Sequence, residues 1–115
     1  MFENKVLEFI EKLKYQESFD EWYLSDFIDE NIKKLSSENA FESSSFIISL
    51  IRLNLESDLL YELLQILLSL KAVSQTNQHP TQLIEDPEIF EDILKLHTDN
   101  SIISTTKDLK KMYNL

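Results

Sequence analysis

Two histidines are the first side chains that could support catalysis or metal binding. His79 lies in a polar stretch beside Pro80, and His97 lies near the end of a segment with helical apolar periodicity. They do not have a metal-ligand spacing such as H-x-x-x-H, and neither has the Glu three residues earlier that di-iron bundles use. A histidine near a helix C-terminus is common, since it meets the negative end of the helix dipole. We therefore expect no metal site.

Acid pairs and hydroxyl groups are the other candidates for chemistry. Asp26 and Glu30, like Glu88 and Asp92, lie four residues apart and would share a helix face. General acid–base catalysis requires burial and a shifted pKa, whereas these faces are predicted to be solvated. The chain has no cysteine and no glycine. It therefore has no thiol nucleophile, no G-x-S-x-G elbow and no glycine-rich phosphate loop. We expect a protein without catalytic activity and without a cofactor.

The charge balance bears on the kind of partner. The 115 residues carry 11 Lys+Arg against 21 Asp+Glu, a formal net charge of -10, and the single arginine is Arg52. Nucleic acids and anionic membranes bind through clustered Lys and Arg, so both are disfavoured as partners. The first residues lack the pattern of a signal peptide, and the densest apolar stretch, Leu59–Val73, is too short and too interrupted to span a bilayer. We expect a cytoplasmic protein.

The apolar residues recur with the helical period of 3.6, which predicts an all-α fold in a single domain, residues 1–115. The six predicted helices are Glu3–Tyr15, Phe19–Leu35, Glu38–Leu53, Asp58–Val73, one that starts at Asp86-Pro87-Glu88 and ends near His97, and a short last helix after Thr105 that runs through Tyr113. The third and fourth are apolar on most sides, which is typical of helices at the centre of a domain.

Local signals predict where the helices start and where the chain turns. Side chains that would cap helix N-termini are Ser18 (in a capping box with Glu21), Ser36 and Ser37, Ser57, Asp86 and Thr105 (with Asp108). The polar stretch Ser74–Glu85 is predicted to be a loop. Because glycine is absent, we expect asparagine to take left-handed conformations at the helix ends, at Asn54, Asn77 and Asn100.

Short links between helices one and two, three and four, and five and six predict three antiparallel hairpins. Their repeat, roughly every 35 to 50 residues, is the spacing of HEAT or armadillo units. No sequence signature repeats between the pairs, so a HEAT-like array and a compact irregular helical bundle both remain open.

One face of the second predicted helix has the composition of a protein-binding surface. Trp22 projects away from the apolar stripe of that helix, and no Lys or Arg occurs from Glu17 to Glu30. Aromatic anchors ringed by charge of one sign are typical of interfaces that attract a partner electrostatically. The predicted partner-binding residues are Phe19, Asp20, Trp22, Tyr23, Asp26, Asp29 and Glu30. The alternative is that Trp22 is a core residue that packs against the first or fourth helix.

A second candidate is a polar stripe on the otherwise apolar third helix, formed by Glu42, Ser45, Ser49 and Arg52. This stripe is a slot for a polar ligand, a structural hydrogen-bonded pair or an exposed edge. Among apolar helices Arg52 still needs a partner, because a buried unpaired charge is costly.

The chain resembles the small, acidic, all-helical immunity proteins that neutralise bacterial polymorphic toxins, some of which are HEAT-like. The resemblance covers most of the chain and is carried by Phe19–Asn31 (FDEWYLSDFIDEN) and by Phe46–Gln78, which ends in SQTNQ. It implies an inhibitor that binds a cognate toxin, often a basic nuclease, and blocks it.

Three hypotheses follow from the sequence. The first is a non-catalytic, immunity- or antitoxin-like inhibitor that uses the acidic aromatic helix. The second is a structural or adaptor helical module within a larger assembly, which predicts exposed apolar faces at its ends. The third is an enzyme or ligand binder that uses the polar stripe, which predicts a concave pocket with perturbed titrating groups.

Overall fold

Two helices that are apolar on most sides form the centre of the fold. The computed structural model describes residues 2–15 and 22–115, and in it α3 (Ser37–Leu53) and α4 (Leu60–Ser74) pack against each other along their length. Ile47, Ile48 and Ile51 of α3 are fully buried. The predicted centre is confirmed, but the apolar surface of α3 ends before its last residue, since Leu53 is 80% exposed.

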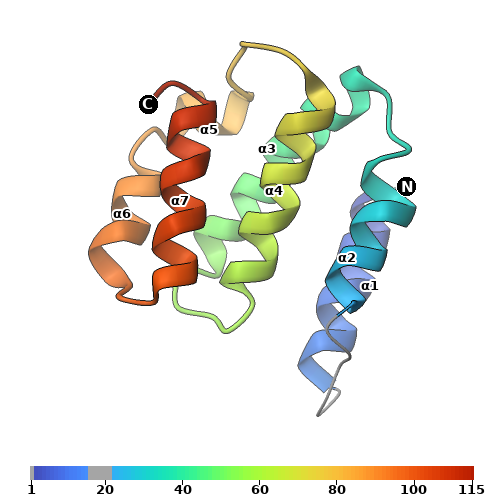
Figure 1. The fold of residues 1–115 in the computed structure, drawn as a ribbon, viewed down its shortest axis with the longest axis horizontal. Helices are drawn as coiled ribbons and strands as arrows, with labels where there is room; N and C mark the ends of the chain where they lie inside the picture. Colours follow the sequence, from blue (N-terminus) through green and yellow to red (C-terminus); the bar gives the residue numbers. More distant parts are fainter. Residues whose placement is uncertain (1, 16–21) are drawn as a thin grey trace.

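The remaining helices surround this pair, and the described residues contain no strand, so the all-α class is confirmed. They are α1 (Phe2–Tyr15), α2 (Tyr23–Phe27), the π-helical turn η1 (Ile28–Ile32), α5 (Thr81–Glu85), α6 (Ile89–Leu96) and α7 (Asn100–Met112). Figure 1 shows three antiparallel pairs, α1 with α2, α3 with α4, and α6 with α7.

The molecule is a thin slab in which α4 lies between two neighbours. Its principal extents are 36 × 34 × 20 Å. Helix α4 packs against η1 on one side and against α7 on the other, while α3 lies behind it and contacts α1 and α5 (Figure 1). This arrangement is a compact helical bundle. None of the helices in the described residues has the length and apolar character that a bilayer crossing requires.

Some of the predicted helix starts are confirmed and others are wrong. Ser36 caps α3, since its Oγ accepts a hydrogen bond from the backbone N–H of Asn39 at 3.1 Å. The predicted cap Asp86 does not cap α6, which begins at Ile89, because the Asp86 carboxylate binds Arg52 instead. The Ser18 capping box lies outside the described residues.

The last helix begins earlier than predicted. Asp99 caps α7 by accepting hydrogen bonds from the backbone N–H groups of Ser101 (2.8 Å) and Ile102 (3.2 Å). The expected cap, Thr105, is a buried residue inside the helix, and its Oγ1 accepts a hydrogen bond from Gln65 Nε2 of α4 at 3.1 Å. Thr105 therefore joins α7 to the central helix and does not start a new one.

The chain reversals also differ from the prediction. Among the described residues, positive φ occurs at Gln75 (49°) and Asn114 (59°) and not at the expected asparagines. Asn54 ends α3 with φ -128°, where its side-chain amide donates to Leu50 O, and Asn100 is the first residue of α7. The predicted loop Ser74–Glu85 contains α5, because Leu83 is buried and holds this short helix against α3.

Glu62, in the first turn of α4, is a half-buried acid. The Glu62 Oε2 atom on α4 is buried and makes no hydrogen bond within the described residues. Burial disfavours the charged carboxylate, and the nearby Asp58 adds like-charge repulsion, so the pKa of Glu62 is raised above its ordinary value of 4.5. The unfolded chain therefore releases this proton at lower pH than the folded protein.

Ionisation of Glu62 is thus expected to lower the free energy of unfolding as pH rises above about 4.5, the unfolded-state value. Glu62→Gln should leave stability unchanged near pH 4 and raise it at pH 7 by less than about 1 kcal/mol, since the site is only partly buried. Urea denaturation of both proteins at the two pH values checks this. Glu42→Gln at an exposed position of α3 controls for the loss of one charge. Equal gains from both variants would contradict the assignment to Glu62.

Candidate partner-binding groove

Helix α1 meets α2 through a stack of three aromatic rings. The ring of Phe9 lies between those of Tyr23 and Phe27, with centroid distances of 5.0 Å and 4.5 Å and interplanar angles of 12° and 26°. Phe9 and Phe27 are buried, and Tyr23 is half-buried. Offset aromatic stacking of this kind adds about 0.5–1.5 kcal/mol per pair beyond the area it buries. The stack therefore fixes the separation of the two helices.

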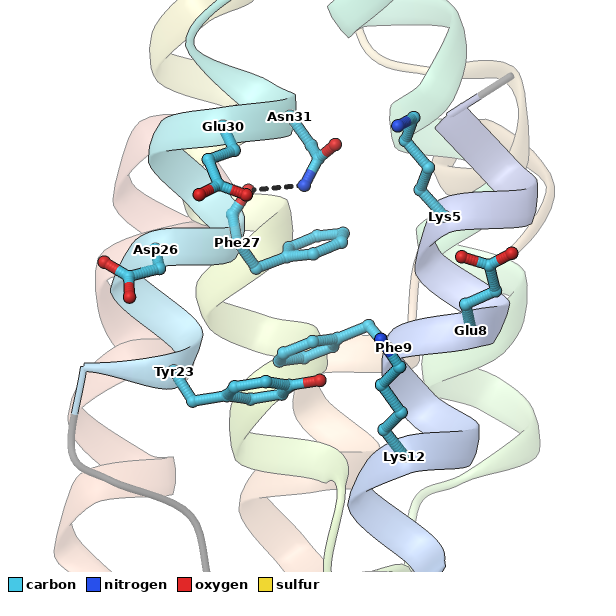
Figure 2. Close-up of a pocket in the computed structure, with 9 residues that line it drawn as sticks. All are labelled: Lys5, Glu8, Phe9, Lys12, Tyr23, Asp26, Phe27, Glu30 and Asn31. Atoms are coloured by element: carbon cyan, nitrogen blue, oxygen red, sulfur yellow. Dashed lines mark hydrogen bonds between the residues drawn. The ribbon is translucent and has the colours of Figure 1, made fainter.

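The three rings form the floor of an open groove of about 370 Å³ between α1 and α2. Its lining residues are Lys5, Glu8, Phe9 and Lys12 from α1, and Tyr23, Asp26, Phe27, Glu30 and Asn31 from α2 and η1. Figure 2 shows the aromatic rings between the helices, with charged side chains on both walls. The groove thus combines an aromatic floor with polar walls, as binding sites for proteins and small molecules do.

The two walls of the groove carry charges of opposite sign. Lys5 and Lys12 lie on the α1 wall, and Asp26 and Glu30 lie on the other. Within the described residues, no ion pair connects these two walls. All four of these side chains are exposed. All four are therefore accessible to a partner that enters the groove.

The wall formed by α2 ends in a π-helical turn. The backbone N–H of Lys33 donates to Ile28 O at 3.1 Å, five residues back, and the Asn31 side chain donates to Phe27 O at 3.0 Å. Such turns are rare inside helices and are frequent at functional sites. Ile32 stays fully buried against the core, while Glu30 and Asn31 line the groove.

The predicted partner-binding residues are divided between this groove and other places. Tyr23, Asp26 and Glu30 line the groove. Trp22 is 62% exposed just before α2, so it is a surface residue and not the core residue of the alternative interpretation. Asp29 faces elsewhere and pairs with Lys33 at 2.8 Å on the exposed surface. Phe19 and Asp20 lie outside the described residues.

The sequence prediction missed the wall that α1 contributes. No Lys or Arg occurs in the sequence from Glu17 to Glu30, but in space Lys5 and Lys12 of α1 line the same groove as Asp26 and Glu30. No local pattern signals this arrangement. It depends on the packing of Phe9 of α1 between the rings of Tyr23 and Phe27.

The polar stripe of α3 connects this helix to α5 and α6. Arg52 donates from Nε to Asp86 Oδ2 at 2.8 Å and from Nη2 to Asp86 Oδ1 at 2.6 Å, and Nη2 also donates to Asp92 Oδ2 at 2.9 Å. The hydrogen bonds and the negative charges of Asp86 and Asp92 raise the pKa of Arg52 above its ordinary value. The partners of Arg52 are therefore these two aspartates and not Glu42, which is exposed.

The two serines of the stripe make local and interhelical hydrogen bonds. Ser45 Oγ accepts from the backbone N–H of Gln82 in α5 at 3.2 Å, and Ser49 Oγ donates to Ser45 O at 3.1 Å. Ser45 and Arg52 thus hold α5 and α6 against α3, whereas the Ser49 contact stays within α3. The stripe therefore has the structural role that the sequence offered as an alternative to a ligand slot.

Both histidines hold the backbone of distant segments. His79 Nε2 lies 2.6 Å from the carbonyl oxygen of Tyr113, and His97 Nε2 contacts that of Leu55. A carbonyl can only accept, so each ring donates its Nε2–H. Within the described residues, no group of three His, Asp or Glu side chains is arranged to hold a metal ion.

Comparison with protein families, with curated proteins and with solved structures finds no match to this chain.

Replacement of Asp86 by alanine should lower the free energy of unfolding by about 1–2 kcal/mol, because a bidentate, partly buried partner of Arg52 is lost while Asp92 remains. Asp29→Ala removes an exposed i,i+4 pair with Lys33 and should cost less than about 0.5 kcal/mol. Urea denaturation at neutral pH compares the two. A cost of Asp86→Ala no larger than that of Asp29→Ala would be inconsistent with a structural role for the Arg52 cluster.

Trp22 is the only tryptophan, so its fluorescence reports directly on this surface. At 62% exposure, its emission should be red-shifted and accessible to acrylamide and iodide in the folded protein. The unfolded protein in urea gives the fully exposed reference for both measurements. A blue-shifted emission that is protected from quenching would instead place Trp22 in the core.

Proposed function

We propose that this chain is a non-catalytic protein-binding protein that acts as an immunity- or antitoxin-like inhibitor in the cytoplasm. It would sequester a basic toxin or nuclease domain through the groove and the neighbouring Trp22. The observation that carries the proposal is the groove itself, in which exposed acidic side chains lie beside an aromatic floor. Aromatic anchors and exposed carboxylates are what a basic partner surface requires.

The position of Trp22 supports the same surface. A large aromatic side chain that is 62% exposed next to the groove provides the kind of anchor found in interface hot spots. The net charge of -10 would attract a basic domain from a distance and speed its association. The resemblance to acidic immunity proteins supplies the inhibitory role.

A second candidate is an adaptor role as a HEAT-like module in a larger assembly. It is favoured by the order of the layers, in which η1, α4 and α7 lie side by side and successive hairpins pack on their neighbours. Exposed apolar side chains such as Leu53, Ile84 and Leu96 would then contact flanking modules. This candidate predicts concentration-dependent self-association, which sedimentation measures.

The direct test is affinity capture from a lysate of the native host by wild type and by the double variant Trp22→Ala/Asp26→Lys. Wild type is expected to retain a basic protein that the variant loses, because the variant removes an aromatic anchor and reverses a wall charge. The association rate of the purified pair should fall markedly as salt rises toward about 0.5 M, where the Debye length is only a few ångströms.

The matched control is Ile84→Ala/Glu85→Lys on α5, which changes a similarly exposed apolar residue (65%) and an adjacent acid far from the groove. Circular dichroism should show that both variants are folded. Capture that survives Trp22→Ala/Asp26→Lys, or an association rate that is independent of salt, would count against the proposed surface.

A further inference from the structure

We infer that the groove between α1 and α2 binds a protein segment that carries both signs of charge, with an arginine against the α2 wall and an acidic side chain against the α1 wall. This inference rests on the proposed protein-binding function and specifies the chemistry of the partner. A purely acidic surface would select any basic segment. This groove would select a pattern of charges instead.

The α2 wall fits a guanidinium group. Asp26 and Glu30 are four residues apart on the same wall and have no ion-pair partner across the groove among the described residues. The ring of Tyr23 lies below them and is only half-buried. Arginine binds carboxylates through a planar fork and stacks on aromatic rings, which lysine does less well.

The α1 wall requires the opposite charge. Lys5 and Lys12 line the groove on the α1 side, opposite the wall that carries Asp26 and Glu30, and Glu8 between them leaves the α1 wall with an excess of one positive charge. A segment with only basic side chains would place a cation against this wall, and such like-charge contacts oppose binding. An acidic side chain at the same point would be attracted. The volume of about 370 Å³ is at the lower end of the usual range for ligand sites and suits a few side chains.

Three blocked hexapeptides test this pattern on the whole 115-residue chain: acetyl-AREREA-amide, acetyl-ARQRQA-amide and acetyl-AQEQEA-amide. Titration of the ¹⁵N-labelled protein should shift amide resonances of residues 5–12 and 23–31. The mixed peptide, acetyl-AREREA-amide, carries both signs of charge, and the other two carry one sign only. The mixed peptide should bind about threefold or more tightly than either single-sign peptide, a difference of the size expected for exposed charge contacts.

Neutralising the charges of one wall should weaken the binding of the peptide that this wall attracts and strengthen the binding of the peptide that it repels. Lys5→Gln/Lys12→Gln should weaken the mixed peptide by about threefold and strengthen acetyl-ARQRQA-amide, because repulsion is removed. Asp26→Asn/Glu30→Gln should weaken acetyl-ARQRQA-amide and strengthen acetyl-AQEQEA-amide. The matched controls are Lys14→Gln on α1 and Asp29→Asn on η1, which carry charges outside the groove lining and should change neither affinity.

Two results would overturn the inference. One is equal binding of acetyl-ARQRQA-amide and the mixed peptide with no effect of Lys5→Gln/Lys12→Gln, and the other is no binding of any peptide at the groove. Either result leaves the proposed function intact if wild type still captures a protein that Trp22→Ala/Asp26→Lys loses. Selective peptide binding without any captured protein would instead support the charge pattern and contradict the inhibitor role.

Discussion

The burial of one broad apolar face of α4 is the constraint on which the rest of the fold depends. Leu60, Leu64, Ile66, Leu67 and Leu70 are fully buried and together cover nearly half of the helix circumference. The opposite side carries the exposed Tyr61 and Ala72. An apolar face this wide needs more than one neighbour, because each exposed aliphatic side chain would cost about 1.5–3 kcal/mol relative to its burial. Helices α3, η1 and α7 supply those neighbours.

The same constraint determines how polar groups near the end of α4 are satisfied. Lys71 is buried, and its ammonium donates to the carbonyl oxygen of Thr76 and lies 5.1 Å from the centroid of the Tyr113 ring. Tyr113 in turn stacks on Phe90 and receives the hydrogen bond of His79 at its carbonyl oxygen. The end of α7, the segment before α5 and the start of α6 are thus joined at one end of the central helix. Buried polar groups need such partners, since an unsatisfied one is costly.

The features that the sequence predicted are those determined by nearby residues. Apolar periodicity located the core faces, because burial recurs with the helical repeat. Ser36 was one of two serines expected to cap the third helix, and the backbone N–H that it binds, that of Asn39, is only three residues away. Asp86 has equally strong local signals, but a guanidinium 34 positions earlier in the chain, that of Arg52, takes its carboxylate. A charge-assisted bidentate contact is stronger than a cap, and it cannot be read from local sequence.

The groove likewise has one wall that local sequence predicts and one wall that depends on tertiary packing. This difference affects how a partner would be recognised. Tyr23, Asp26 and Glu30 could be grouped from the sequence because they lie on one helix, whereas the opposing Lys5 and Lys12 depend on how α1 docks. At a distance a partner meets the net charge of -10, which attracts any basic surface. Within a Debye length of about 8 Å, however, it meets two walls of opposite sign. The net charge, which depends on composition, would thus attract a partner. The two walls, whose arrangement depends on the packing of Phe9, would select it.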